Sequence, residues 1–231
     1  MSANPHIGIP PLCSGPAPEA TGFVAVFIHG RTQSSSDMQV VANRLNIAGM
    51  PCIAIDAADN SWYPNQFMEP FAKNQPRLDF ALQRLDQLLG ELNERGIPNE
   101  HVAIVGFSQG ACLACEYVFR KQQPFAALVA YTGGLIGPEE TRWEPTGNLK
   151  GMPVFLSNGD EDPWVPLGRT RQTLEVFMAM GARVELKVYP GRSHEVSDDE
   201  IRISRTLLQS AMQLATQPPG SGQSPERIPW P

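Results

Sequence analysis

Residues 101–119 read HVAIVGFSQGACLACEYVF, and this stretch decides how the rest of the chain can be interpreted. An apolar, β-branched run typical of a buried strand comes first, and an apolar helical pattern follows it. Ser108 stands between them, flanked by Gly106 and Gly110 in the pattern G-x-S-x-G. A serine at a sharp strand-to-helix turn is the setting of a nucleophile elbow. Such a turn also favours glycine and serine for conformational reasons alone, so the interpretation depends on partners elsewhere in the chain.

Five further apolar runs predict strands. Most are apolar throughout, which is typical of strands buried on both faces of a parallel sheet. The last run alternates apolar and charged residues, which favours a position nearer an edge. The runs are FVAVFIHG (23–30), CIAIDA (52–57), ALVAYTGG (127–134), PVFLSNGD (153–160) and RVELKVYPG (183–191).

Helical patterns lie between the runs. Asp37 is expected to cap the first helix, and Ser197 with Glu200 resembles a capping box at the start of the last. Strand and helix therefore alternate along the chain, which predicts an α/β fold, a mostly parallel sheet with helices on both faces. The patterns cover 37–49, 77–95, 109–121, 167–181 and the segment from 197 onward.

Length and composition indicate one globular domain. The chain has 231 residues, of which 42% are hydrophobic, and its net charge is −6. The basic residues are scattered, so no nucleic-acid partner is expected. We expect an extended, Pro-rich segment at 1–20, the domain at 21–216 and a Pro/Gly-rich tail at 217–231.

The cysteines and the hydropathy favour the cytoplasm. The N-terminus lacks a signal peptide pattern, and no stretch approaches the roughly 20 apolar residues of a membrane span. The four cysteines show no disulfide spacing that a secreted scaffold would need. Cys112 and Cys115 form a C-x-x-C, which is open to a metal or redox interpretation or, more simply, to two small buried helix residues.

A reactive serine needs a base, and the chain offers four histidines. His6 lies in the N-terminal segment, His101 precedes a strand, and His29 ends the first strand. His194 lies in the loop after the last strand, at the carboxyl edge where α/β sheets bind ligands. We therefore expect His194 to be the base.

The base needs a carboxylate to orient it. Asp160, Glu161 and Asp162 follow the fifth run, between Gly159 and Pro163, which mark a turn. Each of the three would complete the Ser, acid, His order of α/β-hydrolases. The residues alone do not decide among them.

Four motifs carry a family resemblance from Phe23 to about Leu214. The chain resembles the phospholipase/carboxylesterase family of α/β-hydrolases, which includes acyl-protein thioesterases and small bacterial esterases. The motifs are FIHG (27–30), GFSQGA (106–111), GDEDPWVP (159–166) and YPG (189–191) followed by the histidine at 194.

The resemblance implies further features. It places the acid at Asp162 and the two oxyanion-hole donors at the backbone N–H groups of Arg31 and Gln109. Many relatives carry another glycine soon after His-Gly, whereas Thr32 follows Arg31 here. It also implies an α/β-hydrolase fold without a large cap domain, a monomer or homodimer, and no metal or organic cofactor.

The segment DNSWYPNQFMEPF (59–71) follows the second strand and is rich in large apolar side chains. It is open to two interpretations, a wall or flap of an acyl pocket, or ordinary core at the sheet edge. We favour the pocket because the loop leaves the carboxyl end of a strand. The expected substrate-binding residues are Trp62, Tyr63, Pro64, Phe67, Trp164 and Val165.

Three hypotheses follow. The first is a serine hydrolase that cleaves carboxylic esters or thioesters of short to medium acyl chains through an acyl-enzyme, with a small-molecule substrate. The second is a non-catalytic binding protein on the same fold. The third is a dienelactone or other lactone hydrolase, which ranks lower because those enzymes typically use cysteine where Ser108 stands. Arg31 and Arg192 are open to contact with an acidic substrate or to a role in surface solubility.

Overall fold

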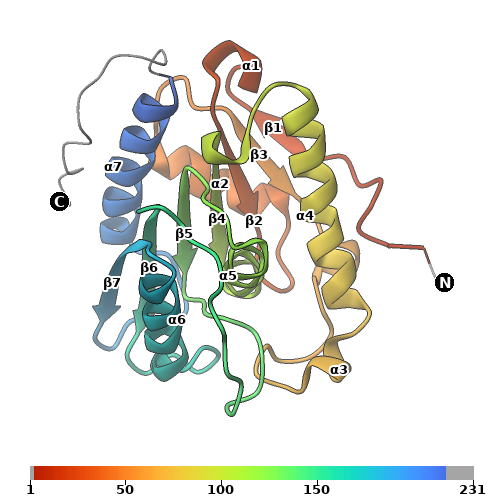
Figure 1. The fold of residues 1–231 in the computed structure, drawn as a ribbon, viewed down its shortest axis with the longest axis vertical. Helices are drawn as coiled ribbons and strands as arrows, with labels where there is room; N and C mark the ends of the chain where they lie inside the picture. Colours follow the sequence, from red (N-terminus) through yellow and green to blue (C-terminus); the bar gives the residue numbers. More distant parts are fainter. Residues whose placement is uncertain (1–2, 217–231) are drawn as a thin grey trace.

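The computed structural model describes residues 3–216, which form a seven-stranded sheet in the order β1-β3-β2-β4-β5-β6-β7 (Figure 1). Every neighbouring pair is parallel except β1 and β3. The strands are β1 (Leu12–Ser14), β2 (Val24–Ile28), β3 (Cys52–Ile55), β4 (Val102–Phe107), β5 (Ala127–Tyr131), β6 (Pro153–Gly159) and β7 (Arg183–Tyr189).

Helices cover both faces of the sheet, so the predicted α/β fold is confirmed. Helices α2 and α7 pack with Phe23, Phe27 and Phe155 on one face, and α4, α5 and α6 pack on the other. Figure 1 shows α5 and α6 lying across the sheet, with α4 beside them. The helices are α1 (Pro18–Thr21), α2 (Ser35–Leu45), α3 (Phe71–Asn74), α4 (Arg77–Glu94), α5 (Gln109–Lys121), α6 (Leu167–Ala179) and α7 (Asp198–Ala215), with 3₁₀ turns η1 (Ala58–Asn60) and η2 (Asn99–His101).

All six apolar runs form the parallel strands. β2, β3, β4 and β5 are buried along their whole length. The alternating run forms β7, whose residues are only partly buried and which lies at the edge of the sheet, as predicted. Burial on both faces therefore explains why the inner strands lack alternation.

Strand β1 was not predicted. Its three residues pair antiparallel with β3 at the other edge, and two of them are exposed. A segment this short, next to Pro10 and Pro11, has no periodicity that sequence analysis can detect. The expectation that residues 1–20 only lie extended over the surface was therefore incomplete. The tail expected at 217–231 lies outside the described residues.

His6 is anchored in the fold, although the sequence suggested a peripheral position. The side chain is fully buried, its ring centroid lies 5.5 Å from that of Trp62, and its Nδ1 accepts the backbone N–H of Ala58 at 3.1 Å. Burial lowers the pKa of His6 from its usual 6.5 to about 4. The N-terminal segment therefore packs against the loop that follows β3.

Two helix starts are fixed by reciprocal capping. In α7, the Ser197 Oγ accepts the N–H of Glu200 at 3.3 Å while the Glu200 carboxylate accepts the N–H of Ser197, which confirms the predicted capping box. In α2, Ser34 is the cap and Asp37 is the third helical residue, so the prediction that Asp37 caps this helix was three residues off. The Asp37 carboxylate accepts the N–H of Ser34 at 2.8 Å.

No helix within residues 3–216 is both long and apolar enough to cross a membrane. The two thiols of the C-x-x-C are buried and free on α5, and burial raises the pKa of Cys112 to about 12. A thiol with such a pKa is a poor metal ligand or nucleophile at neutral pH, so the simpler interpretation of this motif fits the structure.

The turn from β4 to α5 requires its two glycines. Ser108 has φ 54° and ψ −117°, a conformation that costs a residue with a side chain on the order of 1–3 kcal/mol. A Cβ added to Gly106 would lie 2.5 Å from the carbonyl oxygen of Gly110. A Cβ added to Gly110 would lie 2.2 Å from the carbonyl oxygen of Ile28 in β2. Because these neighbours are backbone atoms of the sheet and of α5, they cannot move aside cheaply.

We predict that Gly110→Ala lowers the free energy of unfolding by about 3 kcal/mol or more, since its methyl group overlaps backbone. Gly90→Ala is the matched control, because Gly90 lies on the exposed face of α4 with no atom near its added Cβ. That control should gain stability by about 1 kcal/mol. Urea unfolding measures both, and equal stability of the two variants would contradict the packing described for this turn.

We also predict that His6 makes the protein less stable in weak acid. Since the folded pKa is depressed, the unfolded state binds the proton first, and stability falls as the pH drops from 6.5 to about 4. His6→Gln should reduce this loss by roughly 1–3 kcal/mol. The measurement is urea unfolding at pH 7, 5.5 and 4.5. An identical pH slope for the variant would refute the prediction.

Candidate active site

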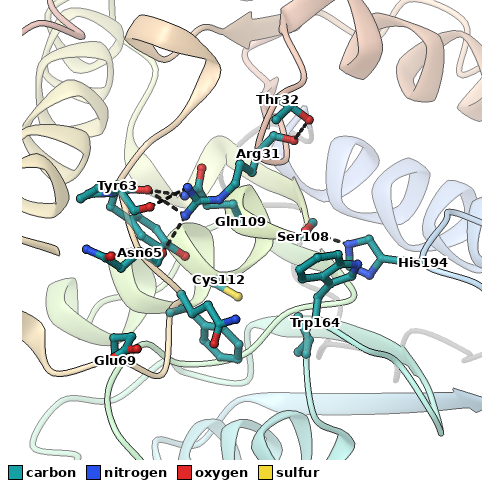
Figure 2. Close-up of a pocket in the computed structure, with 14 residues that line it drawn as sticks. Arg31, Thr32, Tyr63, Asn65, Glu69, Ser108, Gln109, Cys112, Trp164 and His194 are labelled. Carbon is teal, nitrogen blue, oxygen red and sulfur yellow. Dashed lines mark hydrogen bonds between the residues drawn. The ribbon is translucent and has the colours of Figure 1, made fainter. Parts of the chain in front are cut away.

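The imidazole of His194 lies between the hydroxyl of Ser108 and the carboxylate of Asp162 (Figure 2). The distance from Nε2 to Ser108 Oγ is 2.8 Å, and that from Nδ1 to Asp162 Oδ2 is 2.7 Å. A carboxylate only accepts hydrogen bonds, so we assign the imidazole proton to Nδ1. Nε2 is then free to accept the serine proton.

These three side chains come from distant segments that meet at the carboxyl edge of the sheet. Ser108 follows β4, Asp162 follows β6 and His194 follows β7. The strain at Ser108 projects its Oγ beyond the turn, while its N–H donates to the carbonyl of Tyr131 at 3.0 Å. The phenyl ring of Phe107, at the end of β4, lies 5.2 Å from the His194 ring and supports it from the side.

Burial separates the three acidic candidates. Asp162 is buried, and its Oδ1 accepts the backbone N–H groups of Trp164 at 2.9 Å and Val165 at 2.8 Å. Its other oxygen is therefore aimed at His194. Asp160 is exposed and accepts the N–H of Gly191 at 2.8 Å, which ties the acid loop to the loop of His194. Glu161 is exposed.

The backbone N–H groups of Arg31 and Gln109 both belong to residues that line the same cavity as Ser108. Within residues 3–216 neither N–H donates a hydrogen bond to another protein group. Gln109 is the first residue of α5, where N–H groups lack helical partners and favour negative charge. Thr32, which follows Arg31, takes the left-handed conformation, with φ 65°.

The side chains of these same two residues hold the loop at 61–65. The Arg31 guanidinium donates to the carbonyls of Tyr63, Pro64 and Asn65, at 2.9, 2.8 and 2.6 Å. The Gln109 amide accepts the N–H of Trp62 at 2.9 Å and donates to the carbonyl of Tyr63 at 2.8 Å. This part of the loop is therefore fixed to the elements that carry the two free N–H groups.

An open cavity of about 680 Å³ lies over Ser108. Five of the six residues expected to bind substrate line it: Tyr63, Pro64, Phe67, Trp164 and Val165. Five other residues line the cavity and were not predicted, because no sequence pattern distinguishes them within their loops and helix: Thr32, Asn65, Gln66, Glu69 and Cys112.

Trp62 does not line the cavity, contrary to expectation. It is fully buried, and its indole N–H donates to the carbonyl of His29 at 2.9 Å. Its ring packs between the imidazoles of His6 and His29. Trp62 is thus core beneath the loop, while residues 63–67 line the cavity and Met68 and Phe71 pack against the core. The segment combines both interpretations that the sequence left open.

The side chains of His29 and Arg192 are buried and bond to other parts of the protein. His29 is fully buried, burial lowers its pKa, and its Nε2 accepts the N–H of Ala57 at 3.0 Å. It therefore joins the ends of β2 and β3. Arg192 does not line the cavity and is not a surface residue, because its side chain is 7% exposed and pairs with Glu200. Neither interpretation suggested for Arg192 by the sequence fits this burial.

The fold and the arrangement at its carboxyl edge are those of an α/β-hydrolase, and comparison with known proteins agrees. A family model described as phospholipase/carboxylesterase matches residues 50–212. The crystal structure of a phospholipase/carboxylesterase from Dyadobacter fermentans is 38% identical, with a TM-score of 0.83 over 87% of this chain and 97% of that chain. The chain therefore belongs to the phospholipase/carboxylesterase family.

More distant relatives share parts of the chain. A probable carboxylesterase, SOBER1-like, from Arabidopsis thaliana is 26% identical over 62% of this chain and 55% of that protein. Acyl-protein thioesterase 1 of Saccharomyces cerevisiae is 26% identical over 57% of this chain and 59% of that protein. The aligned part thus spans somewhat more than half the length of these curated relatives. The family model begins at residue 50, so it does not include Arg31.

We predict that Arg31→Met loosens the loop at 61–65, because three hydrogen bonds from a charged donor are lost together. The amide hydrogens of Trp62 and Asn65 should exchange at least about tenfold faster, since the loop opens more readily. Hydrogen exchange measured by NMR reports both sites.

Arg171→Met, on the exposed face of α6, is the matched control and should leave these rates unchanged. Unaltered exchange in Arg31→Met would show that the guanidinium does not hold the loop.

Proposed function

We propose that the protein is a serine hydrolase of carboxylic esters or thioesters, with Ser108 as nucleophile, His194 as base and Asp162 as orienting acid. The observation that carries the proposal is the unbroken contact Ser108–His194–Asp162, with 2.8 and 2.7 Å between the bonded atoms. These distances are within the range for proton transfer. Residues 27–30 and 159–166 agree with the family pattern as well.

In the first half of the reaction, Ser108 Oγ attacks the acyl carbon as His194 Nε2 takes its proton. The carbonyl π electrons move to oxygen, which gives a tetrahedral intermediate with one negative charge. Asp162 keeps the Nδ1 proton in place and stabilises the imidazolium that forms. Its fixed orientation follows from the two backbone N–H groups that bind its other oxygen.

The oxyanion is bound by the backbone N–H groups of Arg31 and Gln109 in this proposal. Support comes from their position beside Ser108 and from their lack of protein partners within residues 3–216. Fixed donors need no reorganisation as the charge develops, and one donor of this kind is typically worth about 2.7–4 kcal/mol. Because both side chains also hold the loop at 61–65, this donor pair is rigid.

The second half regenerates the enzyme. As the intermediate collapses, His194 returns its proton to the departing alcohol or thiol, leaving Ser108 acylated. Water then gives a proton to His194 and attacks the acyl carbon. The second intermediate expels Ser108, which takes back the proton, and the carboxylic acid leaves.

The cavity supports a small substrate with a short to medium acyl group. Its volume of about 680 Å³ is in the usual range for small-molecule sites. Tyr63, Phe67 and Val165 offer an apolar wall, and Trp164 is 63% exposed at the rim. The names of the relatives, carboxylesterase and acyl-protein thioesterase, suggest oxygen and sulfur esters alike. A cytoplasmic location and a monomeric or homodimeric state stay predictions.

We predict that Ser108→Ala lowers kcat on p-nitrophenyl esters by about a thousandfold or more, since the nucleophile is removed. Ser36→Ala, on the exposed first turn of α2, is the control and should retain activity. The assay compares acetate, butyrate and octanoate esters with an acyl-CoA of each length and a lactone.

Turnover of the short and medium esters by the unaltered protein, with loss in Ser108→Ala, is the expected result. Equal turnover in Ser108→Ala would end the assignment of the nucleophile. A protein that binds these compounds without cleaving any would instead be the non-catalytic alternative, and cleavage of the lactone alone would favour the third hypothesis.

A further inference from the structure

The loop that carries His194 lies largely at the surface, where Asp160 accepts the N–H of Gly191 and Arg44 donates to the carbonyl of Val196. Gly191, Ser193 and Glu195 are exposed, and His194 itself is only partly buried. The imidazole must nevertheless stay within hydrogen-bond distance of both Ser108 and Asp162. The bonds at Gly191 and Val196 hold the ends of the loop, and a third, internal anchor lies near His194 itself.

The internal anchor is the side chain of Arg192, two residues before His194. Its Nη1 donates to both carboxylate oxygens of Glu200 at 2.6 Å, and also to the carbonyl of Glu195. Its Nη2 donates to Thr132 Oγ1 at 2.7 Å. The buried guanidinium thus bonds across the loop, from Arg192 before His194 to the carbonyl of Glu195 after it.

The anchor lies next to the backbone that holds the nucleophile. Thr132 directly follows Tyr131, whose carbonyl accepts the N–H of Ser108 at 3.0 Å. Thr132 is fully buried in a left-handed conformation, with φ 52°, and its own N–H donates to the carbonyl of Ser157 in β6. The turn of Ser108 is therefore bonded to Tyr131, and the loop of His194 is bonded, through Arg192, to the next residue, Thr132.

Charge and shape both favour arginine at this position. The Arg192 and Glu200 side chains are 7% and 0% exposed, so each would be costly to bury without the other. Glu200 is held in turn by the capping box of α7. A planar guanidinium reaches the carboxylate, the hydroxyl and the carbonyl together, whereas an ammonium group is a single compact charge. Lysine would keep the ion pair and lose the geometry.

We propose that Arg192, through Glu200 and Thr132, positions His194 for proton transfer with Ser108. This role rests on the proposed function, because it matters for catalysis only if Ser108 is acylated. Arg192 is a positioning residue, since it touches neither Ser108 nor the cavity. It acts by restricting the loop of His194 to the arrangement that bonds both partners.

The test is Arg192→Lys, which keeps the charge opposite Glu200. We expect kcat on a short p-nitrophenyl ester to fall about 10- to 100-fold with KM nearly unchanged, because a small misplacement of the base affects the chemical step. Labelling of Ser108 by a fluorophosphonate should slow by a similar factor. A second readout is the NMR signal of the His194 Nδ1–H, which should broaden or disappear in the variant.

Two further variants separate positioning from folding. Arg202→Lys is the matched control, because it makes the same substitution in an exposed ion pair, Arg202–Asp199, on α7, the helix that carries Glu200. It should behave like the unaltered protein. Thr132→Val keeps the branched shape and removes only the oxygen that Arg192 contacts. It should lower kcat a few-fold in the same direction, and it tests the proposal if Arg192→Lys does not fold.

A folded Arg192→Lys with unchanged kcat, labelling rate and Nδ1–H signal would overturn the positioning role and leave the proposed function intact. So would a Thr132→Val variant with none of these effects, if Arg192→Lys is unfolded. An unaltered protein that neither cleaves esters nor reacts with the fluorophosphonate would instead refute the proposed function, while the Nδ1–H signal would still report the position of His194.

Discussion

The strained backbone at Ser108 is the constraint on which the rest of the structure depends. The residue keeps its φ of 54° because the parallel strands on both sides of β4 and the start of α5 leave no other path. Gly106 and Gly110 are required where α5 touches the sheet. The same turn places the N–H of Gln109 at a helix start, where it has no protein partner within residues 3–216, and projects the serine hydroxyl into the cavity. Backbone geometry thus prepares the site before any side chain contributes.

Side chains then brace the loops around this turn. Arg31 and Gln109 fix the loop at 61–65, so the proposed oxyanion donors and one wall of the cavity form a single unit. On the other side of Ser108, Asp160 accepts the N–H of Gly191 in the loop of His194. Arg192, in the same loop, donates to Thr132 at the end of β5. These hydrogen bonds replace the apolar contacts that surface loops cannot make; those of Arg31 and Asp160 are charge-assisted and largely exposed, and those of Arg192 are charge-assisted and partly buried. This bracing explains how loops of modest burial hold distances near 2.8 Å.

Much of this arrangement could be predicted from the sequence. Five largely continuous apolar runs and one alternating run predicted the six parallel strands, and loop order at their carboxyl ends identified Ser108 and His194 as neighbours. Features that depend on three-dimensional contact could not be predicted. Strand β1 is too short for a periodic pattern, and Trp62 and Tyr63 are adjacent and both buried, but only Tyr63 lines the cavity. Residue patterns alone left the acid ambiguous because three carboxylates share one turn; the family resemblance pointed to Asp162, and burial and the contact with His194 distinguish it in the structure.

In the proposed mechanism, Ser108 carries the acyl group during turnover. The most direct measurement is rapid acid quenching of the protein during hydrolysis of a p-nitrophenyl ester, followed by peptide mapping with mass spectrometry. An acyl group is expected on the peptide that contains Ser108, in an amount that approaches one per chain when deacylation is slow. An acyl group on a different residue, or steady hydrolysis with no acylated peptide at any quench time, would contradict the mechanism.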